Sequence, residues 1–240
     1  INQEIEAQNV ATSGWKFTST SSYVTMSFWA RSSLAGTYNI LLKSHDGTAQ
    51  TFSSAFTLVA DTWKKISLTV PGNSNITVNT DNGHGLRCYV VPHFGTDYTT
   101  SGHTSDAWQT LDNTNFTPDY AQNWVNTASA TFDLTGWQVE VGTLASPFEH
   151  EDFGTTLAKC QRYFKRVTGL CTTTTWTTEV NIIELGYMRS LPTLTTTVNT
   201  GANAVFTAFN GLGTPPIYAA YQSTANTSHA IVYVDASAVL

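Results

Sequence analysis

The first half of the chain alternates apolar and polar residues with a period of two. Within residues 24–30, four apolar positions are separated by three others: Val24, Met26, Phe28 and Ala30 by Thr25, Ser27 and Trp29. Residues 38–42 repeat this pattern before the turn-forming sequence His-Asp-Gly at 45–47. Because every second side chain of a strand lies on the same face, both segments predict strands with one buried face.

Further segments of strand character follow at intervals of about ten residues. They cover residues 63–70, which lead into Pro-Gly-Asn at 71–73, the apolar run 86–91, and residues 132–141. Many short strands separated by turn residues are typical of a β-sandwich or jelly roll. We therefore predict an all-β protein that begins with a jelly-roll β-sandwich.

Between residues 92 and 126 the pattern stops, although the segment is rich in aromatic residues. Loops of this length are either functional or disordered. The aromatic residues Tyr98, Trp108, Phe116, Tyr120 and Trp124 argue against disorder. We expect an ordered loop.

The helical pattern is convincing only at residues 154–163, where Asp152 is placed to cap the first turn and Leu157, Cys160 and Phe164 share a face. The Thr-rich sequence that follows carries four charged residues from 172 to 240: Glu179, Glu184, Arg189 and Asp235. This division predicts a jelly-roll domain at 1–150, a connector with a short helix at 151–171, and a small β domain at 172–240. So little charge favours burial of the last domain against other subunits, the alternative being a neutral surface solvated by threonine.

Composition narrows the class of protein. The chain has 240 residues, 11 Lys+Arg against 17 Asp+Glu, and a net charge of −6, which excludes a strongly basic nucleic-acid binder. Its hydrophobic content of 41% excludes a disordered chain. No apolar run approaches the roughly 18–20 residues of a membrane span, so we expect a soluble protein with no membrane insertion. Cys88, Cys160 and Cys171 form no CxxC pair and are interpreted as small buried hydrophobic residues in a protein assembled in a reducing cytoplasm.

Three stretches carry a resemblance to a known family. They are residues 4–10 (EIEAQNV), 78–87 (VNTDNGHGLR) and 134–150 (LTGWQVEVGTLASPFEH), the last followed by LAKCQRYF at 157–164. Together they resemble a domain common in tail-fibre and other appendage proteins of tailed bacteriophages. That domain is similar in turn to the jelly-roll carbohydrate-binding modules of glycoside hydrolases. The resemblance covers residues 1–165, and MRSLPT at 188–193 is similar to the distal β domains of such fibres.

The resemblance implies a non-enzymatic virion protein, a homotrimeric tail fibre or receptor-binding tip assembled in the bacterial cytoplasm. Its partners would be further copies of itself, other virion proteins and a host cell-surface polysaccharide. A chain that opens on Ile1 is expected to be the distal piece of a longer fibre. Two alternatives stay open: a capsid or tail decoration protein without receptor binding, and a tailspike that depolymerises polysaccharide. The tailspike is disfavoured because the sequence shows no β-helix repeat.

Sugar binding by such modules uses aromatic faces that stack on pyranose rings, with polar side chains beside them for the hydroxyl groups. The loop supplies the candidates for such a site: Tyr98, Trp108, Tyr120 and Trp124, with Asp97, Asp106, Gln109 and Asp119 beside them. The alternative is that these aromatic residues fasten the loop to the sandwich or fill a subunit interface. Trp29, Trp63 and Trp137 lie on patterned strands and are interpreted as structural.

Neither catalysis nor a bound metal is predicted. Glu149, Glu151 and Asp152 cluster, but acidic residues before a helix cap it and complement its dipole, and the sequence holds no hydrolytic GxSxG motif or phosphate loop. Related modules carry a structural calcium on paired acids of the closing strand, whereas the matching residues 134–137 are Leu-Thr-Gly-Trp. Glu6 and Glu140 are the carboxylates left that could still meet across strands. His84 and Cys88 are spaced four apart on a predicted strand and do not converge on zinc. We expect no cofactor.

Overall fold

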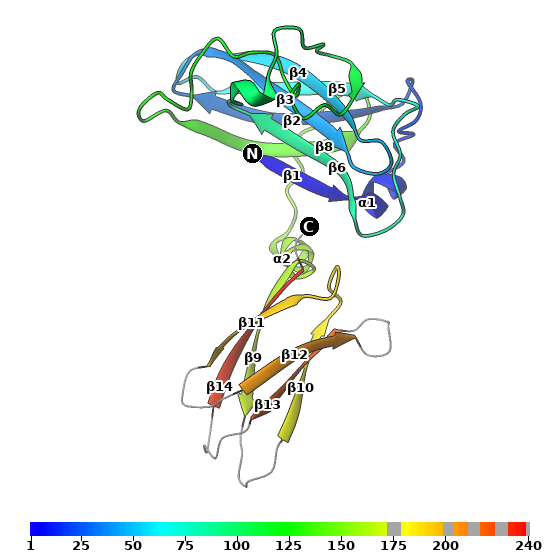
Figure 1. The fold of residues 1–240 in the computed structure, drawn as a ribbon, viewed down its shortest axis with the longest axis vertical. Coiled ribbons are helices and arrows are strands. Elements are labelled where there is room, and N and C mark those ends of the chain that lie inside the picture. Colours follow the sequence, from blue (N-terminus) through cyan, green and yellow to red (C-terminus); the bar gives the residue numbers. More distant parts are fainter. Residues whose placement is uncertain (172–178, 199–203, 211–216, 224–229, 239–240) are drawn as a thin grey trace. The chain divides into compact units, whose positions relative to one another are not determined.

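A computed structural model describes the backbone of residues 1–171, 179–198, 204–210, 217–223 and 230–238, and the side chains of 1–167, 185–195 and 235–238. The chain separates into two compact units, Ile1–Glu149 and His150–Leu240. Strands make up 43% of the protein and helices 10%, and the sheets are antiparallel. This confirms the prediction of an all-β sandwich accompanied by a short helix (Figure 1).

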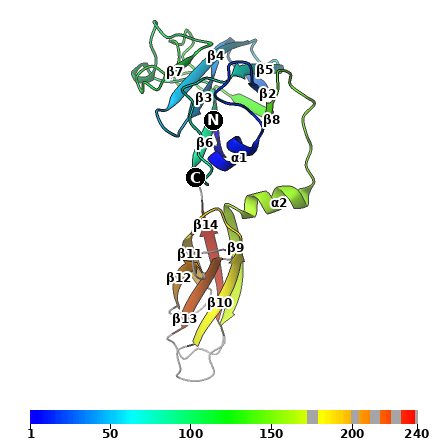
Figure 2. The ribbon, with the colours of Figure 1, turned by 90° about the vertical axis from the view of Figure 1, so that its right-hand side faces the viewer.

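The first unit is a sandwich of two antiparallel sheets, visible in Figures 1 and 2. The five-stranded sheet has the order β1 (Asn2–Glu6), β6 (His84–Val91), β3 (Gly36–Ser44), β4 (Gln50–Leu58) and β7 (Trp108–Thr110). The three-stranded sheet has the order β5 (Lys64–Pro71), β2 (Tyr23–Ser32) and β8 (Phe132–Val141). Helix α1 (Ala7–Thr12) follows β1, and a single turn of 3₁₀ helix, η1 (Thr96–Tyr98), lies in the long connection between β6 and β7.

The core lies between the inner faces of the two sheets. It is built from the alternating apolar residues of the strands, with Met26 and Phe28 of β2 on one side and Ile40 and Leu42 of β3 on the other. Burying each such side chain contributes roughly 1.5–3 kcal/mol, so alternation alone accounts for much of the driving force for folding. The buried phenol of Tyr38 keeps its hydroxyl hydrogen-bonded, at 2.8 Å from Ser32 Oγ and 2.7 Å from the Leu34 carbonyl oxygen.

The second unit begins with helix α2 (Phe153–Gln161), and its described residues continue with six strands. The strands are β9 (Phe164–Cys171), β10 (Glu179–Gly186), β11 (Thr193–Val198), β12 (Ala204–Asn210), β13 (Ile217–Ser223) and β14 (Ala230–Ser237). They form two sheets, β10-β13-β12 and β11-β14-β9 (Figure 2). As expected, Asp152 caps α2: its Oδ1 accepts a hydrogen bond from the Thr155 backbone N–H at 3.0 Å.

Several details differ from the sequence-based expectations. Helix α1, the short strands β1 and β7, and the nine-residue strand β4 were not predicted. Cys88 is buried as expected, and burial raises its pKa to about 12, but Cys160 is exposed on α2 because this helix buries none of its residues. Leu157 and Phe164 are exposed as well. The Thr-rich run 172–178 lies outside the described residues.

Two further observations concern membrane insertion and the expected subunit interface. None of the helices in the described part of the chain has the length and hydrophobicity needed to cross a lipid bilayer. The aromatic side chains between residues 205 and 233, on which the expected subunit interface depends, lie outside the described set.

Candidate functional site

Strand β7 fastens the long aromatic loop to the sandwich. Trp108 on β7 pairs with Phe52 on β4, and their ring centroids are 5.6 Å apart. The Trp108 Nε1–H donates a hydrogen bond of 2.7 Å to the carbonyl oxygen of Pro71, the last residue of β5 in the other sheet. Trp124 also packs against the core. Both indoles are therefore structural contacts of the loop.

The two tyrosines of the loop have different surroundings. Tyr120 is mostly buried, with its ring 5.1 Å from His93, and burial raises the pKa of its hydroxyl. Tyr98 is 49% exposed, with ring centroids 6.0 Å from Phe94 and 6.2 Å from Phe116. Of the predicted aromatic residues in the loop, Tyr98 presents the most open ring.

The four polar candidates divide into two places along the loop. Asp97 lines an open polar cleft of about 550 Å³, and near it Asp119 Oδ1 accepts a 2.7 Å hydrogen bond from Thr99 Oγ1. At β7, Gln109 Nε2 donates to the Thr104 carbonyl oxygen at 2.7 Å. Asp106 adopts a positive φ of 60°, and its backbone N–H donates to Ser53. Tyr98 lies beside Asp97 and Asp119, and Trp108 lies beside Gln109 and Asp106. Sugar binding by these residues stays a prediction.

A second aromatic surface lies on the outer face of the three-stranded sheet. Trp29 of β2 is 44% exposed and Trp63, just before β5, is 42% exposed. The guanidinium carbon of Arg31 lies 5.2 Å from the centroid of the Trp63 ring, and Arg31 Nη2 lies 2.9 Å from Asp133 Oδ2. Both indoles, interpreted from the sequence as structural, are therefore half exposed, and a structural role for them stays a prediction.

A β-bulge in β8 shapes this surface. The pairing of β2 with β8 shifts between Ser27 and Trp29, opposite Gly136, whose φ is +61°. Glycine adopts this conformation without steric cost, and bulges of this kind re-aim the neighbouring side chains. Trp137 consequently points into the core, stacked on Phe28 with centroids 5.9 Å apart, as expected for a structural residue. A Cβ at Gly136 would lie 3.6 Å from the Trp29 ring and 3.9 Å from the Phe148 ring, so the glycine forms the floor between these two aromatic side chains.

The segment after β8 turns back along this sheet and holds Phe148 in place. The Ser146 backbone N–H donates to Glu140 Oε1, and the Glu149 backbone N–H donates to Gln138 Oε1, both at 2.9 Å. Phe148 remains 45% exposed. We call the group formed by Trp29, Arg31, Trp63, Asp133 and Phe148 the Trp29 surface. It combines aromatic faces with one charged, hydrogen-bonding pair, which is the chemistry that recognises a pyranose ring.

The carboxylates considered for other chemistry have local structural roles. Glu140 accepts hydrogen bonds from Gln138 and Ser146, and Asp152 caps α2. Among the residues whose side chains are described, no group of three or more His, Cys, Asp and Glu side chains could hold a metal ion.

Comparison with known proteins adds no relative. No family model matches the sequence, and neither the curated proteins nor the solved structures contain a match. The fold and its surfaces therefore define the class of protein, an all-β chain with a β-sandwich unit followed by a second β unit.

Proposed function

We propose that this chain is a non-enzymatic adhesion protein of a tailed-phage virion, a tail fibre or receptor-binding tip that attaches to a host cell-surface glycan. The observation that carries the proposal is the half-exposed Trp29 indole, fixed beside Phe148 on the outer face of a rigid sheet. The virion context is supported by the resemblance of residues 134–150 to phage appendage proteins.

The chemistry of the Trp29 surface suits a sugar ring. The apolar C–H face of a pyranose stacks on the electron-rich face of an indole, and such aromatic contacts contribute about 0.5–1.5 kcal/mol beyond area burial. The Arg31–Asp133 pair supplies donors and acceptors for the ring hydroxyls at the side of the indole. One such contact is weak, and a homotrimer would present three copies together, which raises the avidity by orders of magnitude without a new contact.

A decoration protein without receptor binding is the alternative that uses the same surface. In that case, Trp29 and Trp63 would be covered by another virion protein in the assembled particle. The two functions differ in whether the purified chain binds a glycan at all.

The test is a glycan array probed with the purified chain, followed by Trp29→Ala. A loss of about 1 kcal/mol per site is roughly a fivefold loss of affinity, and three linked sites compound it. Trp29→Ala should therefore abolish detectable binding to host cells, while Trp29→Tyr, which keeps an aromatic face, should restore part of it. The free energy of unfolding should change by less than about 1.5 kcal/mol, because the indole is half exposed.

The matched control is Trp108→Phe, which changes an indole that the structure places against the core. Glycan binding that is unaffected by Trp29→Ala would refute the proposed site. A wild-type chain that binds no glycan and no host cell would refute adhesion in favour of a decoration role.

A further inference from the structure

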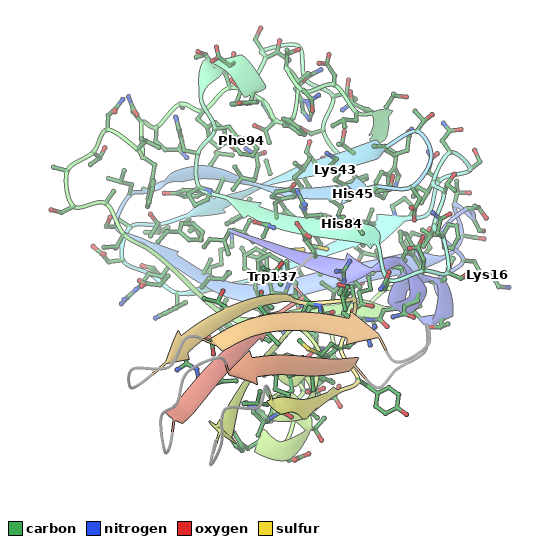
Figure 3. The ribbon with its side chains drawn as sticks, turned by 60° about the horizontal axis from the view of Figure 1, so that its bottom comes forward. Lys16, Lys43, His45, His84, Phe94 and Trp137 are labelled. Atoms are coloured by element: carbon green, nitrogen blue, oxygen red, sulfur yellow. The ribbon has the colours of Figure 1, made fainter. Side chains whose placement is uncertain are left out.

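The outer face of the five-stranded sheet carries a row of charged side chains. Glu4 of β1 pairs with Arg87 of β6, and Arg87 pairs with Lys43 of β3. Directly paired residues on neighbouring strands point to the same face of a sheet. Figure 3 shows Lys43, His45 and His84 grouped over this sheet. We call Glu4, Arg87 and Lys43 the Lys43 row.

Glu4 is fully occupied within the row. One of its carboxylate oxygens, Oε1, pairs with Arg87 Nη2, and Oε2 lies 2.6 Å from His84 Nδ1. Arg87 is oriented further by Tyr89, because its Nη1 donates a hydrogen bond of 3.0 Å to the Tyr89 hydroxyl. Glu4 therefore neutralises the charge of Arg87, and neither of its carboxylate oxygens is left to pair with the next cation along the row.

Lys43 is that cation. Its ammonium group has no hydrogen-bond or ion-pair partner within the described side chains, and its strand neighbour is the like-charged Arg87. Burial and the charge of Arg87 lower the pKa of Lys43. Like charges directly opposite each other destabilise a sheet, so the charge of Lys43 does not favour the fold at this position.

The remaining titratable groups on this face do not supply the missing negative charge. His45 stacks on His84 with centroids 5.0 Å apart, and its buried Nε2 has no hydrogen-bond partner in the described part of the protein. Burial, reinforced by Arg87 and Lys43, lowers the pKa of His45 to about 4, so it is neutral at pH 7. In the row itself, the single carboxylate of Glu4 faces the two cations Arg87 and Lys43, so one positive charge is uncompensated on a chain whose net charge is −6.

We propose that Lys43, supported by Arg87, binds the carboxylate group of an acidic sugar residue, such as a uronic acid of a surface polysaccharide. The sugar identity rests on the proposed adhesion function, whereas the preference for a carboxylate rests on the Lys43 row. A single carboxylate compensates the single free charge. Glu4 disfavours a more highly charged ligand such as a nucleic-acid backbone, because its carboxylate repels additional negative charge.

The experiment is a calorimetric titration of the full chain with trigalacturonate, compared with a neutral galactose trisaccharide. Lys43→Met removes the proposed contact, and Lys16→Met is the matched control, because it removes the same charge from an exposed residue away from the row (Figure 3). We expect the wild type and Lys16→Met to bind trigalacturonate, with an affinity that decreases as salt is added. Lys43→Met should lower that affinity about tenfold or more. Its melting temperature should not decrease, because the substitution removes a like-charge pair.

An equal loss in Lys43→Met and Lys16→Met would show a net-charge effect and overturn the site, as would a wild type that does not bind trigalacturonate. Binding of a triglutamate peptide with the same dependence on Lys43 would assign the site to a protein carboxylate and overturn the sugar ligand. The Trp29 surface is tested with neutral glycans and the Lys43 row with trigalacturonate. A negative result in one experiment therefore does not refute the other proposal.

Discussion

The Trp108 indole connects three parts of the first unit, and its removal should cost stability. It packs on Phe52 of β4 and donates a 2.7 Å hydrogen bond to Pro71 of β5. A core Trp→Ala change costs about 3–5 kcal/mol, and a partly buried indole belongs at the lower end of that range. The unpaired Pro71 carbonyl oxygen contributes about 1 kcal/mol to this loss. We expect Trp108→Ala to lower the free energy of unfolding by about 3–4 kcal/mol, and Trp108→Phe, which keeps a ring, by about 1 kcal/mol.

Urea unfolding followed by tryptophan fluorescence measures both values, and a thermal scan provides a second measure. For a unit of about 150 residues, 3–4 kcal/mol corresponds to a decrease in melting temperature of about 10 °C. Glycan binding by the folded fraction should be unchanged in both variants. A Trp108→Ala protein with unaltered stability and no glycan binding would refute this reasoning and establish the loop as the sugar platform.

Two further predictions concern acid stability and assembly. The pKa of His45 is lowered from 6.5 to about 4, so the unfolded chain takes up its proton first, and stability should decrease as the pH falls from about 6.5 to about 4. Thermal scans at several pH values should show that His45→Gln removes part of this decrease, and an unchanged pH dependence would contradict the prediction. The chain should be a homotrimer, with a mass by light scattering of about three times 26.1 kDa. Removal of residues 172–240 should weaken or abolish the trimer, and a monodisperse monomer at micromolar concentration would contradict the prediction.

The sequence predicts most of the sandwich because burial follows alternation. Residues 132–141 were expected as a strand and form β8 with the same bounds. The alternating segments at 24–30 and 38–42 lie within β2 and β3. In each of these two strands the alternating apolar residues face the core, since the hydrophobic effect selects one face of a strand irrespective of its partner. Strand β7 is only three residues long, too short for any period to be visible, and it is held by its pairing with β4.

Trp29 and Trp137 show what the alternation pattern does and does not predict. Trp29 occupies a polar position in the alternation of 24–30, and that pattern already places it on the outer face. Trp29 is accordingly half exposed, as tryptophan often is. Trp137, by contrast, points inward because of the bulge at Gly136, a backbone feature that shifts the period of the strand.

The Lys43 row could not be found from the sequence because it depends on strand register. Glu4, Arg87 and Lys43 come from three strands that are far apart along the chain, and a pattern of period two fixes the face of a residue but not its partners. A shift of one residue in β6 would turn Arg87 toward the core. The uncompensated charge therefore becomes visible only once the sheet order β1-β6-β3 is known.

The two proposed surfaces lie on opposite outer faces of one sandwich, and this separation constrains how an assembly uses them. The Trp29 surface belongs to the β5-β2-β8 sheet and the Lys43 row to the five-stranded sheet. Cyclic symmetry places equivalent faces of all copies in equivalent surroundings, so a face turned toward the symmetry axis is closed to a polysaccharide in every copy at once. If the face that carries Trp29 or Lys43 is closed in this way, substitution of that residue should alter ligand binding by the isolated unit 1–149. The same substitution should leave ligand binding by the assembled trimer unchanged. Comparing Trp29→Ala and Lys43→Met in both contexts therefore identifies the face that meets the host cell.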